Sequence, residues 1–369
     1  MSTPEGKDPS LRVRQEEPLN AGPPLSALRA DEVTGNDLFF VRNHGNVPAL
    51  DPATYRLEIG GLVENPLSLT LAELRALPPV RRMATLECAG NRRSELIAWK
   101  PIPGELPWHE EAISNAFWTG ASLAELLERA RPRPAARHVA FTGLDQVERH
   151  GKRFGFGGSV PLDKALAPET ILAYEMNGAP LPALHGAPLR ALVPGYIGAR
   201  SVKWLSRITL QEKPSDNYFQ AVAYRLFPPE VTAETVDWES GTMLGDVALS
   251  AVICSPEEGE TVRPGVVRVK GYAIAGAAGG SGEGRRVARV EVSGDGGTSW
   301  VPADLHDDRG PWVWRFWRVS LGLVPGDYEI MVRAWDDAGN GQPETVASVW
   351  NFKGYMNNAW HRVRVRCRE

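Results

Sequence analysis

The stretch TLECAGNRRS, Thr85 to Ser94, is the first place in this sequence where the residue types could do chemistry. It holds Cys88, one of three cysteines in 369 residues, followed by a small Ala-Gly-Asn turn and by two arginines. The small residues leave one side of the sulfur open, and the arginines favour the thiolate, the form that binds metals or attacks electrophiles. From these neighbours alone, Cys88 is a core residue, a nucleophile or a metal ligand.

Two other segments carry clustered cations on irregular backbone. FFVRNHGNVP contains Arg42, Asn43 and His44. LHGAPLRALVPGYIGARSVKW contains His185, Arg190, Arg200 and Lys203, among glycines and prolines that prevent a continuous helix. Each segment alone is typical of a solvated loop. Together they favour a binding site for a phosphate or another oxyanion, because arginine forks and exposed amides suit such groups. A cysteine nucleophile with a histidine base leaves these loops unexplained.

From Tyr55 to about Leu210, the sequence predicts a mixture of helices and strands. These elements must position the candidate residues. Hydrophobic patterns and caps predict helices at LTLAELRAL, opened by Thr70, and at ASLAELLERA, with Leu123, Leu126 and Leu127 on its apolar face. Strands are predicted at YRLEIGGLV, HVAFTGL, ILAYEMNG and SVKWLSRITL. This part of the chain is therefore predicted to be an α+β domain.

The pattern changes after a connection predicted between Asn217 and about Val247, which Pro228-Pro229 interrupts. Short strands are predicted at ALSAVICSP, VVRVKGYAI, RVARVEVS, WVWRFWRVSL, YEIMVRAWD and VASVWNF, with a hairpin turn at Asp295-Gly296-Gly297. Their spacing fits an antiparallel sandwich of the immunoglobulin type. GAAGGSGEG, Gly276 to Gly284, lacks the ending of a phosphate-binding loop and is predicted to be a flexible hairpin loop.

Composition excludes several functional classes. A net charge of -4 gives no basic field for nucleic acid or anionic lipid, and no run approaches the ~20 apolar residues of a membrane helix. The cysteines are too few and too far apart for a disulfide framework, and no CxxC zinc motif or CxxCH haem motif occurs. We expect Cys254 in a core and Cys367 in a terminal strand, HRVRVRCRE. The polar N-terminus lacks an export signal, which favours a cytoplasmic protein.

With these features in place, the sequence resembles the molybdenum enzymes of the sulfite oxidase family, in their bacterial haem-free form. The matching motifs are FVRNH, ATLECAGNRRSE, LAYEMNGAPLP, HGAPLR, VPGYIGARSVKWL, DGGTSW, PWVWRFW, DDAGN and NAWHRV. They follow the family order along most of the chain. Chance agreement on this scale is implausible.

The resemblance implies a specific domain plan. Residues 1–35 would form an extended or disordered leader, 36–240 a molybdopterin-binding oxidoreductase domain, and 241–369 an immunoglobulin-like dimerisation domain. The protein would form a homodimer through this C-terminal domain.

The resemblance also implies the site residues. Cys88 would be the protein ligand to molybdenum, and a soft thiolate suits a metal already held by two sulfurs of the cofactor. The contacts to molybdopterin would be Phe40, Val41, Arg42, Asn43, His44, Asp145, His185, Arg190, Ser201, Val202 and Lys203. The pocket for the substrate anion would hold Arg42, Arg93, Trp108, Tyr224 and Arg315. Two departures affect this set: GELPWHEE is one residue longer than the family pattern, and QAVAYRLFPPE matches little except its tyrosine.

The activity that the resemblance implies is the oxidation of sulfite to sulfate by oxygen-atom transfer. No haem or flavin module is predicted, so the electrons would pass to an external acceptor, dioxygen or a separate cytochrome. The alternatives are a nitrate reductase-like enzyme, a sulfoxide reductase-like enzyme, and a non-catalytic oxyanion-binding protein on the same scaffold.

Overall fold

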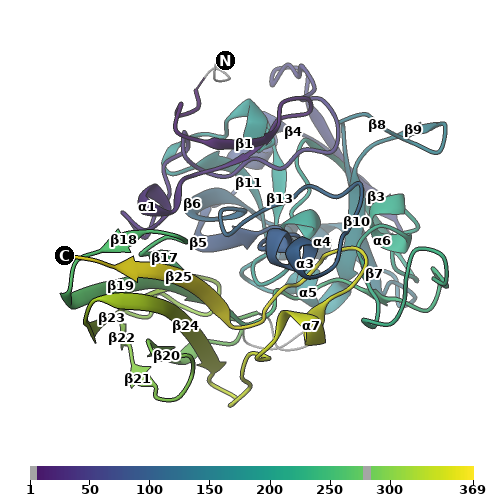
Figure 1. The fold of residues 1–369 in the computed structure, drawn as a ribbon. Helices are drawn as coiled ribbons and strands as arrows, with labels where there is room; N and C mark the ends of the chain where they lie inside the picture. Colours follow the sequence, from purple (N-terminus) through teal and green to yellow (C-terminus); the bar gives the residue numbers. More distant parts are fainter. Residues whose placement is uncertain (1–5, 277–283) are drawn as a thin grey trace.

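The computed structural model describes residues 6–276 and 284–369 (Figure 1). A mixed domain of strands and helices occupies one side of the molecule, and the C-terminal strands form a second body beside it. The N-terminal segment runs along the first domain and brings α1 (Leu25–Leu28) close to the second. Most of the predicted Gly276–Gly284 loop lies outside the described residues.

Two sheets build the first domain. The first has the order β10 (Gly157–Pro161), β7 (His138–Gly143), β14 (Leu205–Gln211), β3 (Arg56–Gly61) and β4 (Leu67–Thr70). The second has the order β12 (Ala179–Pro180), β11 (Ile171–Met176), β6 (Ile113–Ser122) and β5 (Val80–Glu87), and β13 (Arg190–Leu192) also pairs with β11. Only the β14–β3 pair among these is parallel. The four strands predicted in this domain are confirmed.

Helices and short hairpins complete this domain. The helices are α2 (Leu71–Arg75), α3 (Arg93–Trp99), α4 (Leu123–Ala130), α5 (Leu162–Leu166) and α6 (Tyr218–Ala221), with 3-10 turns η1 (Ala183–His185) and η2 (Gly198–Arg200). The hairpins pair β8 (Val147–Arg149) with β9 (Lys152–Phe154) and β15 (Arg225–Leu226) with β16 (Thr242–Met243).

Both predicted helices are present, and the first begins at its predicted cap, Thr70. The side chain of Thr70 accepts from the Glu73 amide, and Glu73 returns the bond in a capping box. Ser122 caps α4, which buries Leu123 and Leu126 against the sheets. The domain core includes this apolar face and residues of both sheets, and it fixes where the connecting loops emerge.

The second domain consists of two sheets that share one core. One has the order β17 (Ser250–Ser255), β19 (Gly265–Ile274), β23 (Arg315–Leu323) and β22 (Asp304–Leu305). The other has the order β18 (Thr261–Val262), β25 (His361–Cys367), β24 (Gly326–Asp336), β20 (Val287–Ser293) and β21 (Val301–Pro302). Cys254 is buried and Cys367 lies in the terminal strand β25, as expected, and Cys367 is buried too. The Asp295-Gly296-Gly297 turn joins the β20–β21 hairpin.

One strand prediction in the second domain is wrong. VASVWNF forms the short helix α7 (Val346–Val349) instead of a strand. Ser348 closes the turn by donating to the carbonyl of Thr345, and Trp350 packs against Leu96 of α3. The apolar residues of this segment therefore cover the first domain rather than extend a sheet.

The leader also differs from the prediction, because residues 12–28 are folded. β1 (Arg12–Gln15) pairs with β2 (Asn20–Gly22), and Leu25 and Leu28 of α1 pack with second-domain residues. Arg12 forms an ion pair with Glu257 at 2.8 Å. The N-terminal segment thus contacts both domains.

The predicted connection between Asn217 and Val247 is folded too. Its first part forms α6, and Phe219 and Tyr224 are buried in the core of the first domain. The fading periodicity reflects short elements at both ends of the connection, while most of residues 228–240 are exposed and lie outside helices and strands. Within the described ranges, every helix is too short or too polar to cross a membrane.

Core packing in the second domain gives a stability prediction. Trp317 is fully buried, and its indole donates to the Tyr272 carbonyl at 2.9 Å. Trp317→Ala should lower the free energy of unfolding by about 3–5 kcal/mol, measured by urea denaturation. Trp99→Ala is the matched control, because Trp99 is 63% exposed. Equal losses in the two variants would contradict this packing.

Candidate functional site

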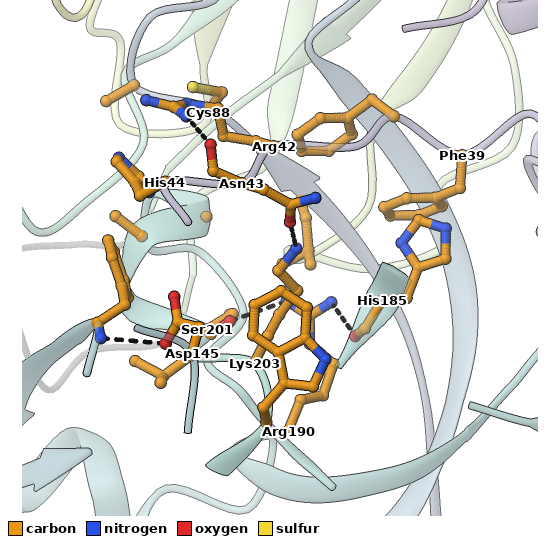
Figure 2. Close-up of a pocket in the computed structure, with 18 of the residues that line it drawn as sticks. Phe39, Arg42, Asn43, His44, Cys88, Asp145, His185, Arg190, Ser201 and Lys203 are labelled. Atoms are coloured by element: carbon orange, nitrogen blue, oxygen red, sulfur yellow. Dashed lines mark hydrogen bonds between the residues drawn. The ribbon is translucent and has the colours of Figure 1, made fainter. Parts of the chain in front are cut away.

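Most of the predicted site residues line one cavity in the first domain (Figure 2). The cavity opens to solvent and measures about 690 Å³ with the space at its opening included. It is formed where loops leave β5, β7, β13 and the turns η1 and η2. Its lining includes the predicted residues Phe40, Arg42, Asn43, His44, Cys88, Asp145, His185, Arg190, Ser201, Val202, Lys203 and Tyr224.

Cys88 lies in the cavity wall, directly after β5, where the chain turns towards α3. Its amide donates to the Ala112 carbonyl, and its sulfur accepts from the Gly90 amide at 3.4 Å. Asn91 holds the turn by donating to Glu87 and accepting from the Ala112 amide. A side chain on Gly90 would come within 2.5 Å of the Arg93 guanidinium, so this position requires glycine. The thiol is thereby fixed at one side of the cavity.

Buried cations line the opposite wall. Arg190 donates to the carbonyls of His185 and Ser201 at 3.0 and 2.8 Å. Lys203 donates to the Leu184 carbonyl at 3.0 Å and to the side-chain oxygen of Asn43. No ion pair neutralises Arg190 or Lys203 in the described parts of the chain. The cavity therefore carries concentrated positive charge.

The lowered pKa values of these groups show that burial in the cavity wall disfavours their charged forms. Burial lowers the pKa of Arg190 to about 9. Burial, followed by the nearby Arg190 charge, holds the pKa of Lys203 well below its usual range. His185 is held neutral in the same way, with a pKa lowered by burial and then by the nearby lysines. An anion in the cavity would relieve this repulsion.

One buried donor in the wall has no hydrogen-bond partner among the described residues. The Asn43 side-chain oxygen accepts from Lys203, which leaves its amide nitrogen as a buried donor without a hydrogen bond. Buried polar groups are normally satisfied, so an unpaired donor in a cavity wall points to an absent acceptor. Asp145 is the one acidic residue in the lining, and its carboxylate already accepts from the Phe156 amide.

The mouth of the cavity combines residues from both domains. Arg42 and Tyr224 line both the cavity and an adjoining groove, where Lys353 and Tyr355 of the second domain join them. The rings of Tyr224 and Tyr355 stack with centroids 5.1 Å apart. Burial raises the pKa of Tyr224 to about 12, so its phenol is protonated at neutral pH, and its hydroxyl lies 3.0 Å from the His44 ring.

Arg93 lies between the Cys88 turn and the second domain. Its guanidinium donates to the Gly354 and Leu106 carbonyls at 2.9 Å each and lies over the Tyr355 ring. A side chain on Gly354 would collide with it at 2.7 Å, and Gly354 has a φ of 63°, which favours glycine. Arg93 is thus a buried cation beside the mouth, although it does not line the cavity.

Besides Arg93, three more predicted residues lie outside the cavity lining. Trp108 is fully buried in the core that also holds Cys88, and its indole nitrogen has no partner in the described chain. Arg315 donates to the carbonyls of His306 and Val287 within the second domain. Val41 is buried and exchanges backbone hydrogen bonds with Ala21.

The second-domain residues at the mouth were missed by sequence reasoning. Lys353 and Tyr355 lie in FKGYMNN, between VASVWNF and NAWHRV, and Lys353 pairs with Glu105. The adjacent NAWHRV motif marks this region as family-like, but it does not show which side chain reaches the first domain. The resemblance predicted a second-domain cation here, and the cation that lies at the mouth is a lysine.

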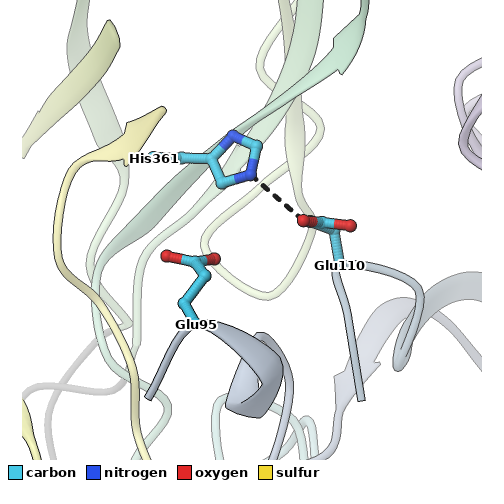
Figure 3. Close-up of side chains that lie close together, drawn as sticks. All are labelled: Glu95, Glu110 and His361. Atoms are coloured by element: carbon cyan, nitrogen blue, oxygen red, sulfur yellow. Dashed lines mark hydrogen bonds and ion pairs between the residues drawn. The ribbon is translucent and has the colours of Figure 1, made fainter. Parts of the chain in front are cut away.

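A second group of possible metal ligands, Glu95, Glu110 and His361, lies at the contact between the domains (Figure 3). These three side chains already form hydrogen bonds with other groups of the protein. Because His361 accepts from the Ile253 amide at Nδ1, its other nitrogen carries hydrogen and donates to Glu110. Burial opposes ionisation of Glu110, but this hydrogen bond holds its pKa at about 2.

Arg92 belongs to the same network of contacts between the domains, which gives this arginine a structural role. Two of its nitrogens bind the two oxygens of Glu95 at 2.7 Å each, and a third donates to Ser250 of the second domain. Its carbonyl accepts from Asn357. Of the two adjacent arginines, Arg92 therefore joins the domains, while Arg93 faces the mouth.

Comparison with known proteins agrees with this geometry. Residues 44–219 match the family model of the oxidoreductase molybdopterin binding domain, and residues 242–368 match that of the Mo-co oxidoreductase dimerisation domain. A sulfite oxidase from Arabidopsis thaliana is 40% identical over 98% of this chain and 95% of its own length. The chain belongs to the sulfite oxidase family. The resemblance predicted from the motifs is confirmed.

Other relatives differ in length. The mitochondrial sulfite oxidase of Homo sapiens is 44% identical, and the chain spans 66% of that protein's length. A nitrate reductase of Oryza sativa is 37% identical, with 42% of its length covered. The sulfane dehydrogenase SoxCD of Paracoccus pantotrophus has the same fold, with a TM-score of 0.79, 24% identity and coverage of 98% of this chain and 88% of that one.

The cavity fits the cofactor of this family. Molybdopterin carries a phosphate, which the unneutralised Arg190 and Lys203 and the unpaired Asn43 donor would bind. Cys88 offers a thiolate ligand to molybdenum from the facing wall. The predicted cofactor, molybdopterin with molybdenum, is supported by the match to the molybdopterin-binding family model.

The buried cations predict how the stability of the cofactor-free protein depends on pH. The folded pKa of Lys203 lies below that of an unfolded lysine, ~10.4, so the unfolded chain binds more protons and stability rises with pH between these values. We expect the free energy of unfolding to rise between pH 7 and pH 9, by at most ~1.4 kcal/mol per pH unit from this group. Lys203→Met should reduce the slope.

Urea denaturation across this pH range measures the effect. Lys213→Met, at an exposed position, is the matched control and should keep the wild-type slope. An unchanged slope in Lys203→Met would contradict the buried charge at this position.

Proposed function

We propose that this chain oxidises sulfite to sulfate at a molybdenum centre held by Cys88 and molybdopterin. The observation that carries the proposal is the meeting of a fixed thiol and unneutralised cations in one cavity, whose mouth is also cationic. When bound, the molybdenum centre supplies oxygen-atom transfer and takes up two electrons. Overall, sulfite and water give sulfate, two protons and two electrons, and the electrons leave to an external acceptor.

For the cofactor we propose the contacts that the family resemblance implies. Arg190 and Lys203 would bind the phosphate by charge, and backbone amides would add donors. The full proposed set is Phe40, Val41, Arg42, Asn43, His44, Asp145, His185, Arg190, Ser201, Val202 and Lys203. The backbone pairing of Val41 with Ala21 supports a role through the main chain only.

At the mouth, the chain would bind and orient the substrate dianion. Arg42 supplies positive charge, Lys353 adds charge that its ion pair with Glu105 offsets in part, and Arg93 adds charge from behind Tyr355. The protonated Tyr224 phenol would donate a hydrogen bond towards the transferred oxygen. His44, held neutral by burial and by Arg42, can accept the phenol hydrogen until substrate binds.

Trp108 and Arg315 receive revised roles in this proposal. The burial of Trp108 supports a contribution to the wall that positions Cys88, not a substrate contact. The two carbonyl contacts of Arg315 support a structural role, and Lys353 is the second-domain cation that we propose for the substrate pocket.

Substrate preference tests the proposal against its nearest alternatives. On metal-replete protein, steady-state assays should show sulfite oxidation far above reduction of nitrate or methionine sulfoxide. Dioxygen consumption and cytochrome reduction, measured with sulfite as donor, identify the acceptor class. Nitrate turnover without sulfite oxidation would contradict the proposal, and the similarity to a nitrate reductase makes this comparison necessary.

Removal of the thiol tests the ligand assignment. Cys88→Ser should lower kcat by at least about 10³-fold, because the metal loses its protein ligand while the turn keeps its backbone hydrogen bonds. Cys254→Ser is the control, since Cys254 is buried in another core. An active Cys88→Ser enzyme, or wild-type protein that acquires no molybdenum during cofactor-competent expression, would refute the assignment; the second result would favour a non-catalytic oxyanion-binding protein.

We further propose that the second domain is an immunoglobulin-like sandwich through which the chain forms a homodimer. Its two sheets with a shared core and its match to a dimerisation-domain model support this. Sedimentation equilibrium showing only monomers would contradict it. The cytoplasmic location also stays a proposal, and cell fractionation tests it.

A further inference from the structure

Lys7 of the N-terminal segment lies buried behind the cofactor cavity, although no part of the proposed mechanism uses it. Its side chain donates to the carbonyls of Asn36 and Phe39 at 2.7 and 2.8 Å, and it lies 2.8 Å from Nε2 of His185. Lys7 is 8% exposed. Phe39 and His185 line the cavity, so Lys7 contacts its wall from the outer side.

The hydrogen bonds of Lys7 bear on which ring nitrogen of His185 carries the hydrogen. A charged lysine has three donors and no acceptor, and two of them are used by carbonyls. While Lys7 is charged, Nε2 of His185 accepts the third, and the hydrogen of the neutral ring then resides on Nδ1. The low pKa of His185, caused by burial and then by the Lys7 charge, agrees with a neutral ring.

The same ammonium joins two segments that are far apart in sequence. Asn36 and Phe39 lead into the loop of residues 40–44, and His185 ends η1, whose backbone carbonyls hold Arg190 and Lys203. The T-shaped contact between the Phe39 and His185 rings, at 5.3 Å, packs against this junction. Loss of Lys7 would leave Lys203 as the link between Asn43 and η1 and would remove the partner of the His185 ring.

We propose that Lys7 is a positioning residue for the cofactor: it fixes the tautomer and orientation of His185 and adds a positive charge behind the phosphate-binding wall. This inference rests on the proposed function, because it assumes that the cavity binds molybdopterin. The N-terminal segment is then part of the cofactor site, not a leader attached to it.

Electrostatics make this contribution depend on pH. Burial, opposed by Asp37, lowers the pKa of Lys7 to about 7. The other charged groups near its contacts are Arg190 and Lys203, which oppose its charge, while a bound phosphate would favour it. Loss of the Lys7 proton removes both the positive charge and the third donor.

Cofactor retention in the loaded protein tests the proposal without relying on activity. Molybdenum by elemental analysis and pterin by fluorescence are followed after gel filtration between pH 6 and pH 9. Lys7→Met should speed cofactor release by about tenfold or more, because a charged hydrogen bond is lost. Lys7→Arg should stay near the wild-type rate at pH 6, and its release should rise less with pH than that of the wild type.

Arg12→Ala is the matched control. Arg12 lies in the same segment but binds Glu257, away from the cavity, so its loss should leave cofactor release unchanged. Release from Lys7→Met at the wild-type rate would overturn the inference, as would equal release from Lys7→Met and Arg12→Ala. Should Lys7→Met fail to fold, wild-type pH dependence in Lys7→Arg would overturn it as well. Wild-type protein without molybdenum would instead overturn the proposed function, and the inference with it.

Discussion

Buried positive charge that forms no ion pair with the described residues is the constraint on which the rest of this structure depends, and Asp145 is the acidic residue near it. Arg190 and Lys203 are held by backbone carbonyls, and no carboxylate forms an ion pair with either within the described residues. Burying such charge is costly unless an anion is present. The fold accepts this cost at one cavity, where the loops from both sheets of the first domain converge. A phosphate-bearing cofactor in the cavity would offset the cost of burying these charges.

The carbonyl contacts also explain why the site is built on irregular backbone. Carbonyls within helices and central strands are already used by the backbone, whereas η1 and the turn at Ser201 leave theirs free to accept from Arg190. Glycine at positions 90 and 354 permits Arg93 to pass between the Cys88 turn and the second domain. Two neighbouring arginines therefore have separate structural tasks, one at the mouth and one in the contact between domains.

Much of this arrangement could be predicted from the sequence, because local patterns and long motifs carry it. The Thr70 cap and the apolar face at Leu123, Leu126 and Leu127 located two helices, and the order of the motifs identified the family. The VASVWNF segment, wrongly predicted as a strand, shows the limit of prediction from sequence patterns. Its apolar residues contact α3 and do not follow the alternation of a strand. Likewise, no pattern distinguishes Lys353 from Arg315 as the second-domain cation, because only the three-dimensional contact between the domains decides which one reaches the cavity mouth.

In the proposed loaded protein, a single bound centre links the charge of one cavity wall to the thiol of the other. X-ray absorption at the molybdenum edge of the loaded protein tests this link most directly, since it counts the sulfur neighbours of the metal. We predict that Cys88→Ser loses one sulfur neighbour relative to the wild type while molybdenum stays bound. An identical sulfur shell in the two proteins would contradict it.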